Sequence, residues 1–174
     1  KNENSCKKCG ASRWKGVAQG LNSGNSKIPA KVMRYFPLTP RLQRMFMCKD
    51  FPTQMVWHAV ERNNDGKLRH PADGEAWKTL DAEYPDFSSD NRNVRLGITA
   101  DGFNPFRTMS STHSTWPIVV VNYNLPPWLN MKPENLILST LIPGPNDPGN
   151  NIDVYMQPLV EELKELWNAG VETY

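Results

Sequence analysis

The sequence predicts a mixed α/β fold in which three β-strands are followed by one long helix. Residues 94–101 alternate apolar and polar side chains, which is the period of a pleated strand. Residues 116–123 are apolar on both faces, as in a buried strand, and residues 135–142 form the third strand. Residues 154–169 carry apolar side chains at helical spacing, with Asp153 placed to cap the helix. The expected order is therefore strand, strand, strand, helix.

The part of the chain before the first strand predicts short helices and loops. Residues 31–36 could form a short strand, and helices are expected over residues 41–47 and 52–60. Asp73 is expected to cap a further helix over residues 75–83. The N-terminal region is thus mostly helical and loop-like.

These patterns divide the chain into three parts. Residues 1–50 form a basic N-terminal region, residues 51–90 a helical connector, and residues 91–174 the sheet with its long helix. The length of 174 residues suits one domain with an appendage, and 39% hydrophobic with 22% charged residues is typical of a globular protein. No apolar run approaches the roughly 18 residues that span a bilayer, so no membrane partner is expected.

The charge is unevenly distributed along the chain. Residues 1–50 hold eleven Lys or Arg and two acids, whereas the rest holds nine Lys or Arg and sixteen acids. A basic N-terminal region favours an anionic partner, and nucleic acid is the favoured class. A solvated basic surface without a partner gives the same pattern. The candidate DNA-binding residues are Arg13, Lys15, the stacking candidate Trp14 between them, and Arg41 and Arg44 on one predicted helix.

Asp101 is the candidate catalytic residue. It ends the first predicted strand and is followed at once by Gly102, so the strand would support a carboxylate with room beside it. Two or three converging carboxylates can hold a divalent metal ion. An Asp-Gly pair after a strand is also an ordinary turn signal, which is the alternative interpretation.

Cys6 and Cys9 form half of a possible zinc site. Two thiolates in a Cys-x-x-Cys pair suit tetrahedral zinc, but such a site needs four ligands. Cys48, His58 and His70 are the candidates for the missing ligands. The alternative is a pair of thiols without metal.

The order of elements, with an acid on the first strand, is similar to the start of ribonuclease H-like nucleases and transposases. Several sequence motifs closely resemble those of the transposase of the plant CACTA (Enhancer/Suppressor-mutator-like) DNA transposons. The segments that carry this resemblance are residues 67–77, 93–97, 99–106, 116–119, 123–127, 141–145 and 153–159.

The resemblance implies an incomplete ribonuclease H-like fold and a fragment of a DDE/D cut-and-paste transposase. Asp101 matches the first catalytic acid of that family, which would hold magnesium or manganese, and the later acids are expected beyond Tyr174. Cys6 and Cys9 match a structural zinc ribbon. The implied partner is the DNA of transposon ends, bound by an oligomer in the nucleus. The alternative is a catalytically inactive DNA-binding remnant.

Overall fold

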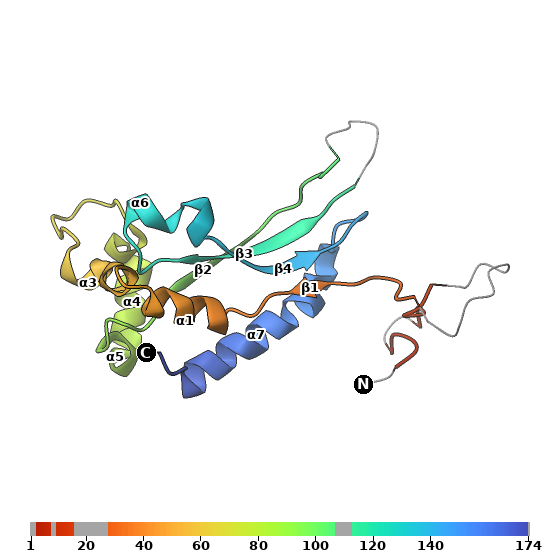
Figure 1. The fold of residues 1–174 in the computed structure, drawn as a ribbon, viewed down its shortest axis with the longest axis horizontal. Coiled ribbons are helices and arrows are strands. Elements are labelled where there is room, and N and C mark those ends of the chain that lie inside the picture. Colours follow the sequence, from red (N-terminus) through yellow and green to blue (C-terminus); the bar gives the residue numbers. More distant parts are fainter. Residues whose placement is uncertain (1–2, 8–9, 16–27, 107–112, 174) are drawn as a thin grey trace.

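A computed structural model describes residues 3–7, 10–15, 28–106 and 113–173 (Figure 1). Within these residues, one four-stranded sheet organises the fold. Its strands are β1 (Arg34–Tyr35), β2 (Leu96–Ala100), β3 (Trp116–Asn122) and β4 (Ile137–Ile142). The three strands expected from the sequence are therefore present, and the short strand expected near residue 34 joins the same sheet.

The sheet is antiparallel throughout, with the order β1-β4-β3-β2. The β2–β3 hairpin brings Leu96 opposite Asn122 and Ala100 opposite Ile118. Among the described residues only β3 pairs with β2, so the other edge of β2 carries unpaired backbone groups. The fold is a mixed α/β structure, as predicted.

Helices occupy most of the remaining described chain. The α-helices are α1 (Thr39–Met47), α2 (Phe51–Met55), α3 (Trp57–Val60), α4 (Glu75–Glu83), α5 (Pro85–Ser88), α6 (Pro127–Asn130) and α7 (Ile152–Ala169). Three 3₁₀ turns are η1 (Pro71–Asp73), η2 (Pro133–Asn135) and η3 (Gly149–Asn151). Within the described part of the chain, none of these helices combines the length and apolar composition that crossing a bilayer requires.

The hydrophobic core lies between the sheet and helices α1, α2 and α7. Figure 1 shows α7 running along the sheet. The apolar stripe of α7 faces inward, as its helical spacing predicts, and Leu159 is fully buried. The core residues are Leu38, Leu42, Met45, Met55, Ile118, Val120, Leu125, Ile137, Ile142 and Leu159. These contacts place one face of the sheet in the core, and the other face is partly covered as well, since Val121 on it is 5% exposed.

Glu162 of α7 fastens the N-terminal segment to this core. Its carboxylate accepts hydrogen bonds from the backbone N–H groups of Leu38 and Thr39, both at 2.9 Å, and from the hydroxyl of Thr39 at 2.7 Å. The hydroxyl of Tyr35 donates to the same carboxylate. The first turn of α1 has no cap from its own N-cap residue, Leu38, so Glu162 satisfies amide groups that would otherwise lack partners.

Candidate functional site

Asp101 lies one residue beyond the end of β2. Ala100 pairs with Ile118, and the isolated bridge between Phe103 and Thr115 continues the same register. Asp101 is therefore opposite Pro117, at the end of the β2–β3 ladder. Its side chain is exposed, as a ligand-binding carboxylate requires.

Steric contacts explain why the residue after Asp101 is a glycine. A Cβ atom at position 102 would lie 2.7 Å from the hydroxyl oxygen of Ser114 and 2.7 Å from the indole of Trp116. Only glycine admits this close approach without displacing its neighbours. The backbone N–H of Gly102 donates to Oδ1 of Asp101 at 2.8 Å, which orients the carboxylate locally.

One carboxylate does not make a divalent metal site. Magnesium binds about six oxygen ligands in near-octahedral geometry, and protein sites use one or two carboxylates together with water or phosphate oxygens. Across the described ranges, no three His, Cys, Asp or Glu side chains are grouped so that they could hold a metal ion. The described residues therefore fit a metal ion at Asp101 only as a partial ligand set.

The strand register places a cation in line with Asp101. Pro117 pairs with Leu141, and Leu141 pairs with Arg34 on β1. Residues directly opposite each other in antiparallel strands point to the same face, so these four residues form one row across the sheet. We call the side that bears this row the open face, because the neighbouring residues Tyr35 and Ile118 point into the core on the other side. Three strand spacings separate Asp101 from Arg34, or about 14 Å.

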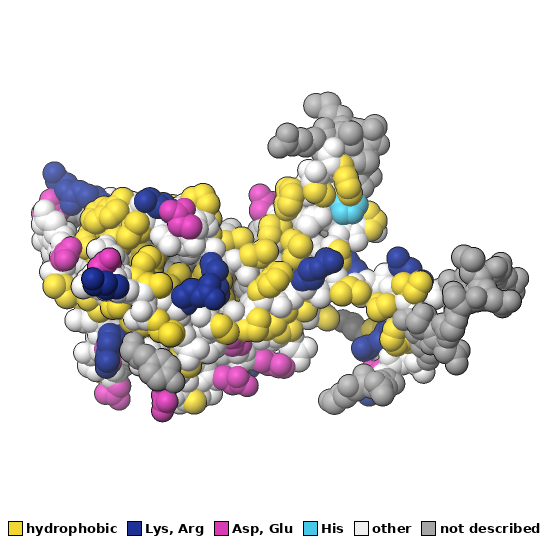
Figure 2. All heavy atoms as spheres, viewed as in Figure 1, with side chains coloured by type: hydrophobic (Ala, Val, Ile, Leu, Met, Phe, Trp, Pro, Cys, Tyr) yellow, Lys and Arg dark blue, Asp and Glu magenta, His cyan; other side chains and the backbone are white. Residues whose placement is uncertain are grey.

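The predicted DNA-binding pair on α1 lies on the surface. Arg41 and Arg44 are both exposed, whereas Leu42 and Met45 between and beside them turn into the core. Both arginines line a shallow hollow of about 160 Å³ that Cys48 and other residues complete. Figure 2 shows Lys and Arg side chains following one another over the band of surface that carries α1, β1 and the segment before β1. Acidic side chains lie along α7 and also at the end of the molecule that carries α3, α4 and α5.

The N-terminal candidates have partners within their own segment. Arg13 forms an ion pair with Glu3 at 3.4 Å, and the indole N–H of Trp14 donates to Asn4 at 3.1 Å. Trp14 is half-buried, while Lys15 is exposed. The structure thus presents Lys15 as an available cation, but it does not display Trp14 as a fully exposed stacking surface.

The proposed zinc half-site is only partly described. Cys6 is half-buried in a tight turn in which the N–H of Gly10 donates to the carbonyl of Cys6 at 2.9 Å. Gly10 has a φ of 69°, the conformation that glycine adopts without strain. Cys9 lies outside the described residues, so the pairing of the two thiols stays a prediction.

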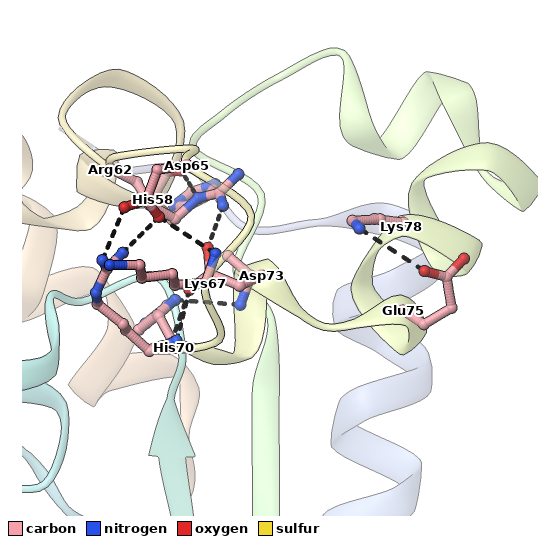
Figure 3. Close-up of polar contacts among 10 residues, drawn as sticks. His58, Arg62, Asp65, Lys67, His70, Asp73, Glu75 and Lys78 are labelled. Atoms are coloured by element: carbon pink, nitrogen blue, oxygen red, sulfur yellow. Dashed lines mark hydrogen bonds and ion pairs between the residues drawn. The ribbon is translucent and has the colours of Figure 1, made fainter.

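The histidines proposed to complete the zinc site, His58 and His70, both lie in the connector (Figure 3). Nε2 of His70 bonds the carbonyl of Leu125 at 3.0 Å, and Nδ1 accepts from the N–H of Ala72 at 3.1 Å. Both ring nitrogens are therefore engaged in hydrogen bonds. Burial lowers the pKa of His70, and burial together with the nearby charge of Arg95 lowers the pKa of His58 to about 4. Both rings are neutral at pH 7.

Asp73 has a different role from the predicted helix cap. The N-cap of α4 is Gly74, and no side chain caps that helix. The carboxylate of Asp73 instead accepts from the backbone N–H groups of Arg69 and His70, both at 2.9 Å, and pairs with Arg62. These hydrogen bonds hold the pKa of Asp73 below its usual value. The expectation was wrong because the preceding loop folds back and supplies closer donors.

A larger hollow lies away from Asp101. Its volume is about 610 Å³, and it lies between the start of β2, the connector helices and the last turns of α7. Arg95, 7% exposed, contributes to its wall while its guanidinium pairs with Asp81 and lies over the ring of Trp77 at 4.4 Å. Asp101 is not among the lining residues, so the hollow and the candidate metal ligand are separate features.

Arg34 is the candidate that sequence reasoning missed. A strand of two residues has no periodicity to reveal which side chain is exposed, and its alignment with Asp101 depends on pairings with β4 and β3. The sequence signal was limited to its membership of the basic region.

Comparison with known proteins identifies the family. The model of the transposase family tnp2 matches residues 65–174, which is more than half of the chain and includes Asp101, β2, β3, β4 and α7. Neither the curated proteins nor the solved structures gave a match. The transposase assignment made from the sequence is confirmed at this level, and the chain belongs to the transposase family tnp2.

Proposed function

We propose that this chain is part of a cut-and-paste DNA transposase of the CACTA type, and that Asp101 is one of the carboxylates of its DDE/D site. Membership of a transposase family implies interaction with DNA. The observation that carries the proposal is the exposed position of Asp101 at the end of β2, inside the segment that the family model matches. The antiparallel order of β2, β3 and β4 before α7 also agrees with the start of a ribonuclease H-like sheet.

The metal requirement limits what the described residues can do. Asp101 would supply one oxygen ligand to magnesium or manganese, whose role in such enzymes is to activate the attacking hydroxyl and stabilise the leaving oxygen. The remaining ligands have to come from other groups, and we assign no step of the reaction to the described residues. What they contribute is a rigid strand end for the carboxylate and a surface for DNA.

The proposed surface for DNA is the basic band that includes Lys15, Arg34, Arg41 and Arg44. Arg41 and Arg44 lie one helical turn apart, so both can approach one stretch of phosphate backbone. Binding to transposon ends, assembly as an oligomer and action in the nucleus belong to the same proposal.

The test of the catalytic role is Asp101→Asn in a transposase polypeptide that contains residues 1–174. We expect loss of cleavage of labelled transposon-end DNA in magnesium or manganese, with unchanged DNA retention, because the amide is a poorer metal ligand of the same shape. Asp86→Asn is the matched control, since Asp86 is an exposed acid on α5 outside the row. Cleavage that survives Asp101→Asn would remove Asp101 from the mechanism.

A DNA-binding role without catalysis is the second candidate. The observation that favours it is the isolation of Asp101 from other metal-ligating groups among the described residues, beside a basic surface that needs no metal. It predicts that wild-type protein retains DNA in a salt-dependent manner but shows no cleavage under any metal condition. Metal-dependent cleavage that Asp101→Asn abolishes would exclude this alternative.

A further inference from the structure

We infer that DNA crosses the open face of the sheet and that Arg34 anchors its phosphate backbone there, in line with Asp101. This inference rests on the proposed function, because it takes DNA as the ligand. It adds a residue and a path that the sequence did not indicate.

The charge of Arg34 is available to a partner. Three other exposed arginines have acidic neighbours: Arg13 pairs with Glu3, Arg69 with Asp65, and Arg92 with Asp90. Arg41 and Arg44 on α1 are exposed and, like Arg34, form no ion pair with a described residue. Arg34 is exposed on β1 and forms no ion pair with any described residue. A guanidinium without an ion-pair partner can bind phosphate, because its N–H donors lie in one fixed plane.

The row between Arg34 and Asp101 suits a DNA backbone. Its two intermediate residues, Leu141 and Pro117, carry no charge, so no anion lies between Arg34 and Asp101 along the row. The length of about 14 Å is within the reach of a short stretch of one DNA backbone.

The two faces of the sheet differ in their suitability for DNA. The other face is covered by α7, which carries the acidic side chains Glu161, Glu162 and Glu165. An acidic helix repels the phosphate backbone, whereas the register places the cation Arg34 on the open face. Charge therefore selects DNA as the occupant of the open face.

The first test removes the proposed anchor. The full chain is titrated into a short labelled DNA duplex at increasing salt, for wild type, Arg34→Ala, Arg34→Lys and Arg92→Ala. One lost phosphate contact lowers the slope of log affinity against log salt by about 0.9, so the advantage of wild type over Arg34→Ala should shrink about 3.5-fold between about 50 and 200 mM salt. Arg34→Lys should keep the wild-type slope.

Arg92→Ala is the matched control for charge. It removes one exposed arginine as well, but Asp90 neutralises that arginine through hydrogen bonds at 2.6–3.2 Å. We expect its slope to equal that of wild type. If Arg34→Ala and Arg92→Ala change the slope equally, Arg34 is not an anchor and the inference is overturned.

The second test asks whether DNA crosses the face. Leu138 pairs with Val119 and lies on the open face, with 39% of its surface exposed. Leu138→Glu would place a carboxylate on the open face beside the row and should weaken binding by up to about fivefold, the repulsion expected of two unit charges about 4 Å apart in water. Val160→Glu on α7 is the control, because Val160 is 40% exposed on the other side.

The outcomes separate this inference from the function on which it rests. Wild-type binding that is weak and flat with salt would contradict the DNA role itself. If wild type binds DNA with a steep salt dependence and Leu138→Glu binds DNA as tightly as Val160→Glu, only the path across the open face is refuted. Circular dichroism of each variant establishes that it is folded before its binding is compared.

Discussion

Replacing Glu162 by alanine should loosen the attachment of α1 and the N-terminal segment to the core. The carboxylate accepts hydrogen bonds from Tyr35, Leu38 and Thr39, and two of these donors are backbone amides at the start of α1. Alanine leaves these amides without a cap. Because Thr39 and Tyr35 are partly buried, water can replace the lost acceptor only in part.

The expected cost follows from the number and kind of bonds lost. Hydrogen bonds to a charged group contribute about 1.5–3 kcal/mol each, and a helix cap about 1 kcal/mol, but bonds to one carboxylate are not additive. Since the site is only partly buried, we expect a loss of about 2–4 kcal/mol in the free energy of unfolding. For a chain of this length each kcal/mol shifts the melting temperature by about 2–4 °C.

The measurement is urea denaturation followed by circular dichroism, with Glu161→Ala as the control on the same helix. Glu161 is exposed and accepts one hydrogen bond from Gln157 at 2.8 Å, a type of pair that contributes about 0.2–0.5 kcal/mol. If the free energies of unfolding of Glu162→Ala and Glu161→Ala differ by less than about 0.5 kcal/mol, the carboxylate does not hold the segment and the reasoning fails.

The pH dependence gives an independent check on Glu162. Burial raises the pKa of Glu162, but the hydrogen bonds from Tyr35, Leu38 and Thr39 lower it by more, so it lies below the usual value of 4.5. A carboxyl with a lowered pKa in the folded state stabilises the fold above the unfolded pKa and loses this effect as pH falls through the folded pKa. Wild type should therefore lose more stability than Glu162→Ala as pH falls below about 4.5.

Two further predictions concern the hairpin end and the connector. Gly102→Ala should cost about 1–3 kcal/mol of unfolding free energy in urea denaturation, because its Cβ would meet Ser114 and Trp116 at 2.7 Å; an unchanged midpoint would mean that the hairpin end adjusts freely. The pKa of His58 is lowered to about 4, so stability should fall as pH drops from about 6.5 to 4, by up to roughly 3 kcal/mol. His58→Leu should flatten this fall, and an NMR titration that shows His58 protonated near pH 6 would contradict it.

Periodicity predicted the main elements well. The expected strands and the long helix agree with β2, β3, β4 and α7 to within about two residues at each end. This succeeded because each segment presents a complete apolar face over several residues, and burial of that face requires one secondary structure. The cap of α7 was wrong, since Asn151 rather than Asp153 is its N-cap.

Short elements were predicted less well. Residues 52–60 were expected to be one helix, but they form α2 and α3, with Val56 outside helical geometry between them. Asp73 was expected to cap α4 and instead holds the loop at η1. At this scale, capping depends on which donors the tertiary fold brings near, and the local sequence does not contain that information.

The sequence by itself determined the transposase family, the order of strands and helix, the basic front, and an aspartate followed by glycine at the end of a strand. Only the tertiary structure decided that β1 pairs with β4 more than one hundred residues later, that Glu162 caps α1, and that Arg34 shares a row with Asp101. Periodic patterns report how one segment buries its own apolar face. Register between distant segments arises from packing of the whole core, so a two-residue strand acquires its role only when the fold is complete.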